Sequence, residues 1–323
     1  MTELARARFV VTGGAGFIGG AMAAALGQRG AEVVIVDLPD KIAELSDPGS
    51  HRYVVGDVSD ARTYRELSRF APFDGVLHLA AQTSNRVSHE EPERDVLTNA
   101  LGTLRLVEWC CASGIQRLLF SSSMAVYGHP VRLPCSESDP VNPFSYYGIT
   151  KLAGEHYIRA NVERGLKPTI FRLFNVYGPG QNMRNLKQGM ASIYLAYALR
   201  GEKIPITGSL DRFRDFVYID DVVDAWLRAL HEPSTCGQTF NLGTGRSTTV
   251  RDLLRLIIGA AGEDPVTYPV EQVAGHFGDQ FGMTADATAF RAATGWAPTV
   301  RLEEGIRRMT EWAKITISHH PAG

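Results

Sequence analysis

Thr12-Gly13-Gly14-Ala15-Gly16-Phe17-Ile18-Gly19 is the stretch of sequence that decides the fold of this chain. It follows a short apolar run, Arg8-Phe9-Val10-Val11, which predicts a buried strand, and it opens an apolar helix. Gly13, Gly16 and Gly19 have the G-x-x-G-x-x-G spacing, in which glycines permit a tight turn and a close approach of backbone to a pyrophosphate. The charge of that group then faces the helix N-terminus. Strand, glycine turn and helix in this order predict a dinucleotide site.

An acidic residue ends the second predicted strand and supports this interpretation. Glu32-Val33-Val34-Ile35-Val36 leads into Asp37, close to the offset of about 20 residues at which an acid bonds the adenosine ribose hydroxyls. A carboxylate there repels a 2′-phosphate, and no arginine follows in Leu38-Pro39-Asp40. We therefore expect NAD and not NADP. The alternative is that Asp37 is only a turn residue before Pro39.

Strand and helix patterns alternate along the first half of the chain. Strands are predicted near residues 8–12, 32–37, 52–56, 74–80, 116–122 and 168–174. This alternation is typical of an α/β fold with a Rossmann-type doubly wound parallel sheet. We expect an NAD-binding domain over residues 1–175, joined by a returning segment at about 215–245, in which residues 239–245 form one more strand and turn. Residues 176–323 should form mainly a smaller, interleaved substrate-binding lobe.

Two long helical patterns, near residues 94–113 and 145–164, carry apolar residues on more than one face. One face should pack on the sheet, and the other could form the helix bundle of a homodimer. The alternative is a monomer in which the C-terminal region covers these helices.

Composition excludes several classes of protein. The 323 residues are 44% hydrophobic with a formal charge of −2, which fits a globular protein and gives no reason to expect a nucleic acid or an acidic membrane surface as partner. The N-terminus lacks the apolar core of a signal peptide, and no apolar run reaches the ~20 residues of a membrane span. We expect a cytoplasmic protein. The four cysteines and nine histidines show neither C-x-x-C pairs nor H-E-x-x-H spacing, so we expect no metal.

A possible catalytic set lies farther along the chain. Tyr147 is followed four residues later by Lys151, and the run Ser121-Ser122-Ser123 ends 24 residues before the tyrosine. A hydroxyl, a phenol and an ammonium are the groups needed to move a proton while a hydride moves the other way. The pair alone is weak, because an exposed aromatic residue and a cation on one helix face have the same spacing. It becomes informative beside a nucleotide site.

With these residues identified, the chain resembles the extended short-chain dehydrogenase/reductase family, and within it the NAD-dependent nucleotide-sugar epimerases of the UDP-galactose 4-epimerase type. The resemblance covers nearly the whole length. It is carried by the glycine motif, Gly56-Asp57-Val58, Leu77-His78-Leu79-Ala80-Ala81, Asn99, the serine run, Tyr147-Gly148-Ile149-Thr150-Lys151, Arg172-Leu173-Phe174-Asn175-Val176-Tyr177-Gly178-Pro179, Arg214-Asp215-Phe216-Val217 and Asn241-Leu242-Gly243.

The resemblance implies a mechanism and a cofactor site. Tyr147 would be the base that takes the proton of a sugar hydroxyl, Lys151 would lower the pKa of that tyrosine and anchor the ribose, and Ser123 would orient the sugar oxygen. Oxidation, turnover of the 4-keto sugar and reduction from its other face would invert C4 of a nucleotide-linked hexose, with a UDP-sugar expected. The cofactor-binding residues implied are Gly13, Gly16, Phe17, Ile18, Gly19, Asp37, Asp57, Val58, Leu79, Ala80, Ala81, Asn99, Ser121, Tyr147, Lys151 and Phe174.

Substrate binding is implied at a second set of positions, in addition to Ser123. Asn175 would lie near the diphosphate, the guanidinium of Arg214 would bind phosphate, and Thr207 would stack on the base. Arg86 lies in the loop after the fourth strand, where an arginine suits a uronic acid, although a surface pair with Glu90 or Glu91 fits equally. His276 stands where typical epimerases carry an arginine that grips the diphosphate, and a loop histidine without a role is the alternative.

Two apolar residues favour one reaction within the family. Nucleotide-sugar 4,6-dehydratases carry an acidic pair where this chain has Met124 and Ala125, and UDP-glucuronate decarboxylases typically keep a glutamate at the position of Ala125. Epimerisation is therefore favoured over both. A UDP-glucuronate 4-epimerase variant, a nucleotide 4-keto-sugar reductase and a non-catalytic NAD-binding regulator stay open.

Overall fold

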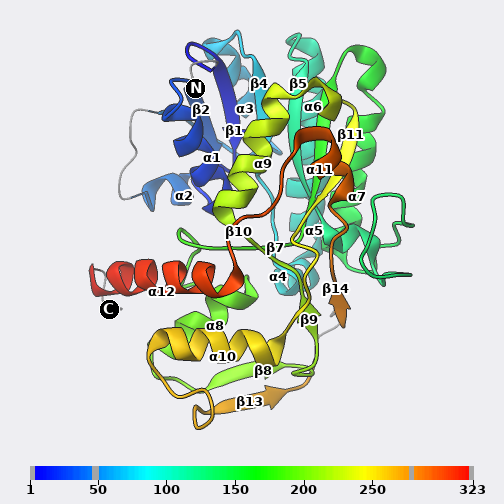
Figure 1. Ribbon diagram of the computed structural model, residues 1–323. Helices are drawn as coiled ribbons and strands as arrows, with labels where there is room; N and C mark the ends of the chain where they lie inside the picture. Colours follow the sequence, from blue (N-terminus) through cyan, green and yellow to red (C-terminus); the bar gives the residue numbers. More distant parts are fainter. Residues whose placement is uncertain (1–3, 46–50, 276–279, 320–323) are drawn as a thin grey trace.

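A parallel sheet forms the centre of the molecule. The computed structural model describes residues 4–45, 51–275 and 280–319, and within them seven strands form this sheet in the order β11-β6-β5-β4-β1-β2-β3 (Figure 1). The strands are β1 (Arg8–Thr12), β2 (Glu32–Asp37), β3 (Arg52–Val55), β4 (Gly75–His78), β5 (Arg117–Ser123), β6 (Lys167–Leu173) and β11 (Gln238–Leu242). The doubly wound sheet predicted from the sequence is confirmed.

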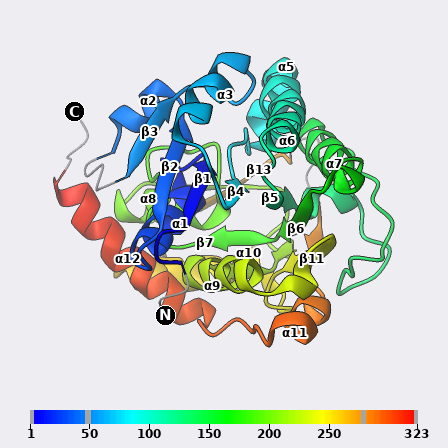
Figure 2. The same cartoon turned by 90° about the horizontal axis from the view of Figure 1, so that it is seen from above.

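Helices cover both faces of the sheet, which explains why its strands are apolar on both sides. One face packs on α1 (Phe17–Gly27), α9 (Ile219–His231) and α11 (Thr288–Thr294), and the other on α3 (Ala61–Leu67), α6 (Gly102–Ala112) and α7 (Tyr146–Arg159) (Figure 2). Val11 and Leu77 face the first group, whereas Val10 and Val76 face the second. The side chains alternate between two hydrophobic clusters, as a period of two requires.

The helix expected near residues 94–113 differs from the prediction. The chain forms α4 (Asn85–Glu90) and α5 (Pro92–Asp95), continues through a π-helical segment, Val96–Leu101, and then enters α6. A π turn inserts one residue into an otherwise α-helical run, and the residue types alone do not mark where it falls. The segment carries Asn99, one of the predicted site residues. The short helix α2 (Pro39–Ala43) follows β2.

The C-terminal part builds a third hydrophobic cluster below the sheet in Figure 1. Its elements are α8 (Met190–Leu199), α10 (Val250–Ala261), α12 (Leu302–His319), the paired strands β8 (Ile204–Thr207) and β13 (Val270–Val273), the paired strands β7 (Asn175–Tyr177) and β10 (Phe216–Tyr218), and the small sheet of β12 (Thr248–Thr249), β9 (Phe213–Arg214) and β14 (Gly282–Met283). No helix of the described residues is long and apolar enough to cross a membrane.

The chain crosses between these two parts more than once. β11 lies parallel to β6 with Phe240 opposite Phe171, so residues 238–242 form a strand of the main sheet. Before it, α9 packs on the same sheet. The division into an NAD-binding domain and a substrate lobe near residue 175 stays a prediction. The carboxyl ends of the parallel strands face the C-terminal part, which is where ligands of open α/β sheets bind.

Candidate active site

The glycine loop between β1 and α1 packs against the end of β4. Gly13 has φ +70°, and a Cβ atom built on it would lie 2.7 Å from the backbone nitrogen of Ala80. A Cβ on Gly19 would overlap the carbonyl oxygen of Gly13, and the amide of Gly16 donates to that same oxygen at 3.0 Å. Only glycine fits at Gly13 and Gly19. Phe17 and Ile18, the first residues of α1, pack against the C-terminal hydrophobic cluster.

Asp37 lies at the end of β2 and holds the glycine loop. Its carboxylate accepts hydrogen bonds from the backbone amides of Ala15 and Leu38, both at 2.9 Å. Burial raises the pKa of this carboxyl, and the two amides act in the opposite direction. Asp37 therefore holds the glycine loop through hydrogen bonds. It also lies at the end of β2, where the sequence predicts a residue that binds the ribose.

The next strand end carries the pair predicted to contact adenine. Asp57 accepts a hydrogen bond from the amide of Ser59 at 2.7 Å, which closes a short turn. Val58 is buried, and its side chain lies against Gly102 at the start of α6. The structure places Val58 in the core beneath this turn, with Asp57 partly exposed above it.

A buried polar chain fixes the end of β4, and the sequence did not predict it. The Thr12 hydroxyl accepts the amides of Leu79 and Ala80, each at 3.2 Å, and lies 2.7 Å from His78 Nδ1. Burial, with the charge of Lys151 second, lowers the pKa of His78 to about 3. His78 is therefore neutral at physiological pH. The alternation of side chains along β4 predicts that His78 is buried. It does not predict which side chain forms a hydrogen bond with it.

Asn99 connects the loop after β4 to α7. Its Oδ1 accepts the amide of Gln82 at 2.9 Å, and its Nδ2 donates to the Gln82 carbonyl at 3.0 Å and to the Thr150 hydroxyl at 3.2 Å. Ala81, the residue before Gln82, lies in this loop and is partly exposed. Asn99 thus shapes the predicted cofactor loop through the backbone.

Ser123, Tyr147 and Lys151 meet beside this loop. Ser123 is the last residue of β5, and Tyr147 lies in the first turn of α7, which is capped by Ser145 accepting the amide of Gly148 at 3.1 Å. The Ser123 and Tyr147 side chains are hydrogen-bonded to each other. Lys151, one turn farther along α7, is only 2% exposed, and its Nζ lies 4.7 Å from the centre of the Phe120 ring. The sequence set is assembled at the carboxyl end of the sheet.

Electrostatics at this set differ from the expectation for Tyr147. Burial raises the pKa of Tyr147 to about 12, partly offset by the Ser123 hydrogen bond and reinforced by the negative charge of Asp95. Burial lowers the pKa of Lys151 to about 7, although Glu155 and Asp95 both act to raise it. Desolvation penalises the charged form of both groups and is the largest cause of each shift. The protein alone therefore keeps Tyr147 protonated.

Ser121 and Ser122, the other two serines of the run, precede Ser123 on β5. Ser122 donates to Glu155 Oε1 at 2.6 Å, and Arg172 binds both oxygens of the same carboxylate at 3.0 and 2.9 Å. Ser121 is buried within β5. Phe174, the residue after β6, is buried and donates its amide to the Leu242 carbonyl at 3.0 Å.

Asn175 and Arg214, two predicted substrate residues, lie in different small sheets and are linked through the backbone of Asp215, the residue after Arg214. Asn175 donates its amide to the Asp215 carbonyl at 3.0 Å and its Nδ2 to the same oxygen at 3.3 Å. Arg214 is 7% exposed, and its guanidinium donates to the carbonyls of Phe213, Phe281 and Gln280. Arg214 is therefore a buried cation and not an exposed surface charge.

The remaining predicted substrate residues are more dispersed. Thr207 ends β8, and its carbonyl accepts a hydrogen bond from Arg212. Arg86 is more than half exposed on α4 and pairs with Glu90 at 2.9 Å, so the surface pair is the arrangement formed here. Lys187 binds the other oxygen of Glu90 at 3.0 Å. His276 lies outside the described residues.

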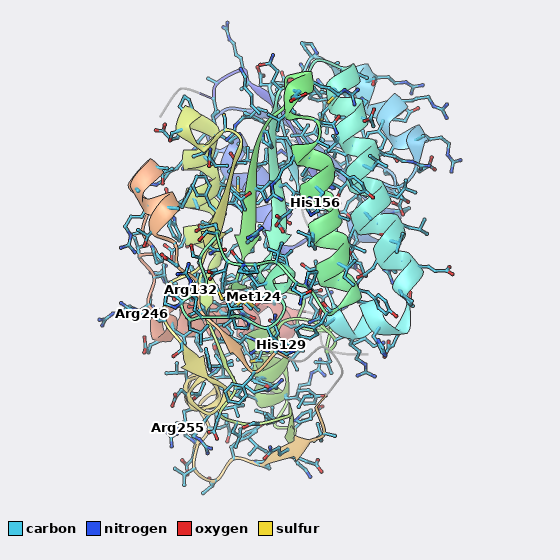
Figure 3. The ribbon with its side chains drawn as sticks, turned by 90° about the vertical axis from the view of Figure 1, so that its right-hand side faces the viewer. Met124, His129, Arg132, His156, Arg246 and Arg255 are labelled. Carbon is cyan, nitrogen blue, oxygen red and sulfur yellow. The ribbon has the colours of Figure 1, made fainter. Side chains whose placement is uncertain are left out.

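Met124 lies where the sheet meets the C-terminal part (Figure 3). The side-chain Nδ2 of Asn175 donates to its sulfur at 3.7 Å. Ala125 follows it in the 3₁₀ turn after β5, with its amide donated to the Ser123 hydroxyl at 3.2 Å. An acid at either position would stand beside the serine and the asparagine. This chain has a thioether and a methyl group there instead.

A model of the NAD dependent epimerase/dehydratase family matches residues 9–243. The chain belongs to this family. It is 36% identical to UDP-glucose 4-epimerase of Mycolicibacterium smegmatis over 94% of this chain and 98% of that protein. The crystal structure of UDP-glucose 4-epimerase of Thermotoga maritima with UDP-glucose superimposes with TM-score 0.87 at 35% identity, covering 96% of this chain and 99% of that one. The Thermus thermophilus enzyme with NAD gives 0.86 at 33% identity, covering 95% and 99%.

Membership in the epimerase/dehydratase family confirms the resemblance to extended short-chain dehydrogenase/reductases and the dependence on NAD. It does not assign roles to single residues of this chain, so the predicted site residues stay predictions. The structure adds Thr12, His78, Gln82, Asp95 and Glu155 to the surroundings of the site. Of these five, only Thr12 and His78 lie within the motifs that carry the family resemblance. A polar residue at a buried strand position was the feature of the sequence that could have indicated their role.

Proposed function

We propose that this protein is an NAD-dependent epimerase that inverts C4 of a nucleotide-linked hexose, with a UDP-sugar as substrate. The observation that carries the proposal is the hydrogen-bonded pair of Ser123 and Tyr147 above buried Lys151, at the strand ends next to the glycine loop. Sequence similarity to UDP-glucose 4-epimerases along nearly the whole chain supports it.

The residues present fit a dinucleotide. Gly13 and Gly19 let the loop pack closely against Ala80 and against its own backbone, where no side chain would fit. Helix α1 begins directly after this loop, so the backbone amides at its N-terminus favour a pyrophosphate. Asp37 stands at the end of β2 with two backbone amides holding its carboxylate. When bound, NAD supplies a positively charged nicotinamide ring that takes up a hydride and returns it.

The side chains of this protein would then move the proton. Tyr147 takes the proton of the sugar 4-hydroxyl and gives it back to the 4-keto sugar, and Ser123 donates a hydrogen bond to that oxygen. Lys151 as an ammonium stabilises the phenolate. Because burial raises the pKa of Tyr147 to about 12, the base needs positive charge nearby to act at neutral pH.

The substrate would lie between the sheet and the C-terminal part. We propose Asn175 and Arg214 for the diphosphate, Thr207 for the base, and His276 for the position that an arginine occupies in typical epimerases. Arg86 is free for a uronic acid only if its pair with Glu90 opens, so we propose a neutral hexose first and a uronate second.

The assay uses purified protein with UDP-glucose, UDP-N-acetylglucosamine and UDP-glucuronate in turn, and follows the anomeric proton signals by NMR. Conversion of at least one sugar to its 4-epimer, without added cofactor, is the expected result. A nucleotide 4-keto-sugar reductase would leave these sugars unchanged, and would oxidise added NADPH only when a nucleotide 4-keto sugar is supplied to accept the hydride. A non-catalytic regulator would bind NAD and do neither.

We also propose a cytoplasmic homodimer. Val96 and Leu97 on the π-helical segment and Tyr146 and Ile149 on α7 are each about half exposed. Large apolar side chains gathered on two neighbouring helices favour burial against a second copy. Helices of both copies would pack as a bundle on the face of the sheet away from α9.

A further inference from the structure

Glu155 is a buried carboxylate that joins helix α7 to two strands of the main sheet. It is 0% exposed and lies about two turns after Tyr147. The Ser122 hydroxyl donates to its Oε1 at 2.6 Å, and Arg172 donates to Oε1 and Oε2 at 3.0 and 2.9 Å. Ser122 on β5 and Arg172 on β6 stand opposite each other in the parallel pair. The carboxylate therefore spans both strands at one level of the sheet.

The ion pair of Glu155 with Arg172 is shielded from water. Arg172 is 4% exposed, and its Cζ also lies 4.8 Å from the centre of the Tyr127 ring. A second arginine, Arg159, binds Oε2 of Glu155 at 2.7 Å from the same helix. Charge-assisted hydrogen bonds are short, and a bidentate pair fixes geometry as well as adding energy. These bonds hold the Glu155 carboxylate in place, and Ser122 connects it to β5.

A glycine beside Glu155 lets α7 come close to β5. A Cβ atom built on Gly154 would lie 2.9 Å from the Phe120 ring. This packing sets the distance between the helix and the strand, but an apolar contact has no preferred direction. A hydrogen bond has both a preferred length and a preferred direction. The bond between Ser122 and Glu155 therefore supplies what the packing does not, a fixed position of α7 along β5.

The proposed catalytic side chains belong to the same helix and strand. Ser123 follows Ser122 directly on β5, and Tyr147 precedes Glu155 on α7. A shift of α7 along β5 would therefore move Tyr147 relative to Ser123. We propose that Glu155 is a positioning residue which, through its hydrogen bond with Ser122, sets where Tyr147 lies relative to Ser123. This inference rests on the proposed function for its effect on the rate of epimerisation.

The test is Ser122→Ala, which removes the bond to β5 and keeps the ion pair of Glu155 with Arg172. A change of Glu155 itself would leave that arginine buried without its anion, which is strongly destabilising. In Ser122→Ala, kcat should fall about 10-fold, because a misplacement of about 1 Å costs up to about 10²-fold in rate. KM for the nucleotide sugar and retention of NAD should keep their wild-type values, since neither ligand is proposed to contact Ser122.

Ser192→Ala is the matched control. Ser192 is 2% exposed, as Ser122 is, and its hydroxyl donates to the carbonyls of Gln188 and Gly189 just before α8, outside the main sheet. It should leave kcat unchanged even where it lowers the melting temperature. A folded Ser122→Ala protein with the wild-type kcat overturns the inference. Equal loss of kcat in both variants also overturns it, since the loss would then follow from stability alone.

An NMR measurement lets the two proposals fail separately. The protein is labelled with ¹³Cζ-tyrosine, and the Tyr147 signal is assigned through Tyr147→Phe. In Ser122→Ala this signal should move toward its position in Ser123→Ala, and in Ser192→Ala it should stay where it is in the wild type. If the wild-type protein epimerises no sugar, the proposed function fails, whereas the Tyr147 signal still decides the role of Glu155. An unmoved Tyr147 signal in Ser122→Ala overturns the inference.

A double variant separates positioning from other effects on the rate. If Ser122 acts by placing Tyr147 relative to Ser123, its removal should matter little once Ser123 is gone. Ser122→Ala should therefore lower kcat by less than about twofold in the Ser123→Ala background. The full loss of about 10-fold in that background would show that the two serines act independently, and it overturns the inference.

Discussion

Gly13 and Ala80 lie so close together that a Cβ atom on Gly13 would be 2.7 Å from the Ala80 nitrogen. Gly13→Ala should therefore abolish retention of NAD and lower the free energy of unfolding by more than the ~1–2 kcal/mol of backbone strain at positive φ. Gly114→Ala is the matched control, since Gly114 has φ +69° but nothing within 4 Å of a built Cβ. Denaturant unfolding and cofactor released from the heated protein measure both effects. Equal destabilisation by the two variants would show that the close approach does not matter.

Tyr147→Phe removes one hydroxyl from the proposed base. Epimerisation should fall by about 10²- to 10⁴-fold, because that is the usual contribution of a general base, while NAD should stay bound. Tyr146→Phe is the adjacent control, with Tyr146 half exposed and stacked on His89. Its rate should equal that of the wild type. A Tyr147→Phe protein with unchanged activity would remove tyrosine from the mechanism.

The low pKa of His78 in the folded protein leads us to expect a loss of stability in mild acid. Its folded pKa of about 3 lies below the value of about 6.5 expected in the unfolded chain. The contribution of the neutral His78 ring to the free energy of unfolding is fully present above pH 6.5. It is lost as the pH falls toward 3, at about 1.4 kcal/mol per pH unit for one proton. His78→Gln should flatten this slope in urea unfolding measured at several pH values.

His156→Gln provides the comparison for His78, because His156 is exposed on α7 (Figure 3). Its slope between pH 6.5 and 4 should match that of the wild type. If His78→Gln also keeps the wild-type slope, the acid sensitivity comes from carboxylates and not from this histidine.

Ile149→Glu tests the proposed dimer. The charge would be placed among Val96, Leu97 and Tyr146 on the apolar helix face, and the dimer should dissociate at micromolar concentration by sedimentation velocity. Val266→Glu introduces the same charge at a side chain that is 90% exposed, far from this face, and should leave the mass unchanged. A wild-type protein that sediments as a monomer would end the dimer proposal.

Sequence reasoning predicted what depends on local spacing. The glycine turn and Asp37 lie in one strand-turn-helix unit, and Tyr147 and Lys151 share one helix face, so their relation follows from helix and strand geometry. It did not predict that Thr12 would meet His78 or that Gln82 would orient Asp95, because those contacts join residues brought together only by the sheet. For Arg86 the sequence allowed either a contact with a uronic acid or a surface ion pair. The structure forms the ion pair, with Glu90 one helical turn away.

Strand β11 has a consequence for the order in which the protein is made. It completes the main sheet by pairing residues 238–242 with residues 169–173, so a ribosome must synthesise most of the chain before β6 gains its second neighbour. Until then the newly made part carries an open strand edge, lined by Ile170 and Phe171, which other chains can pair with. Chaperone binding during translation should therefore be strongest between the emergence of β6 and that of β11.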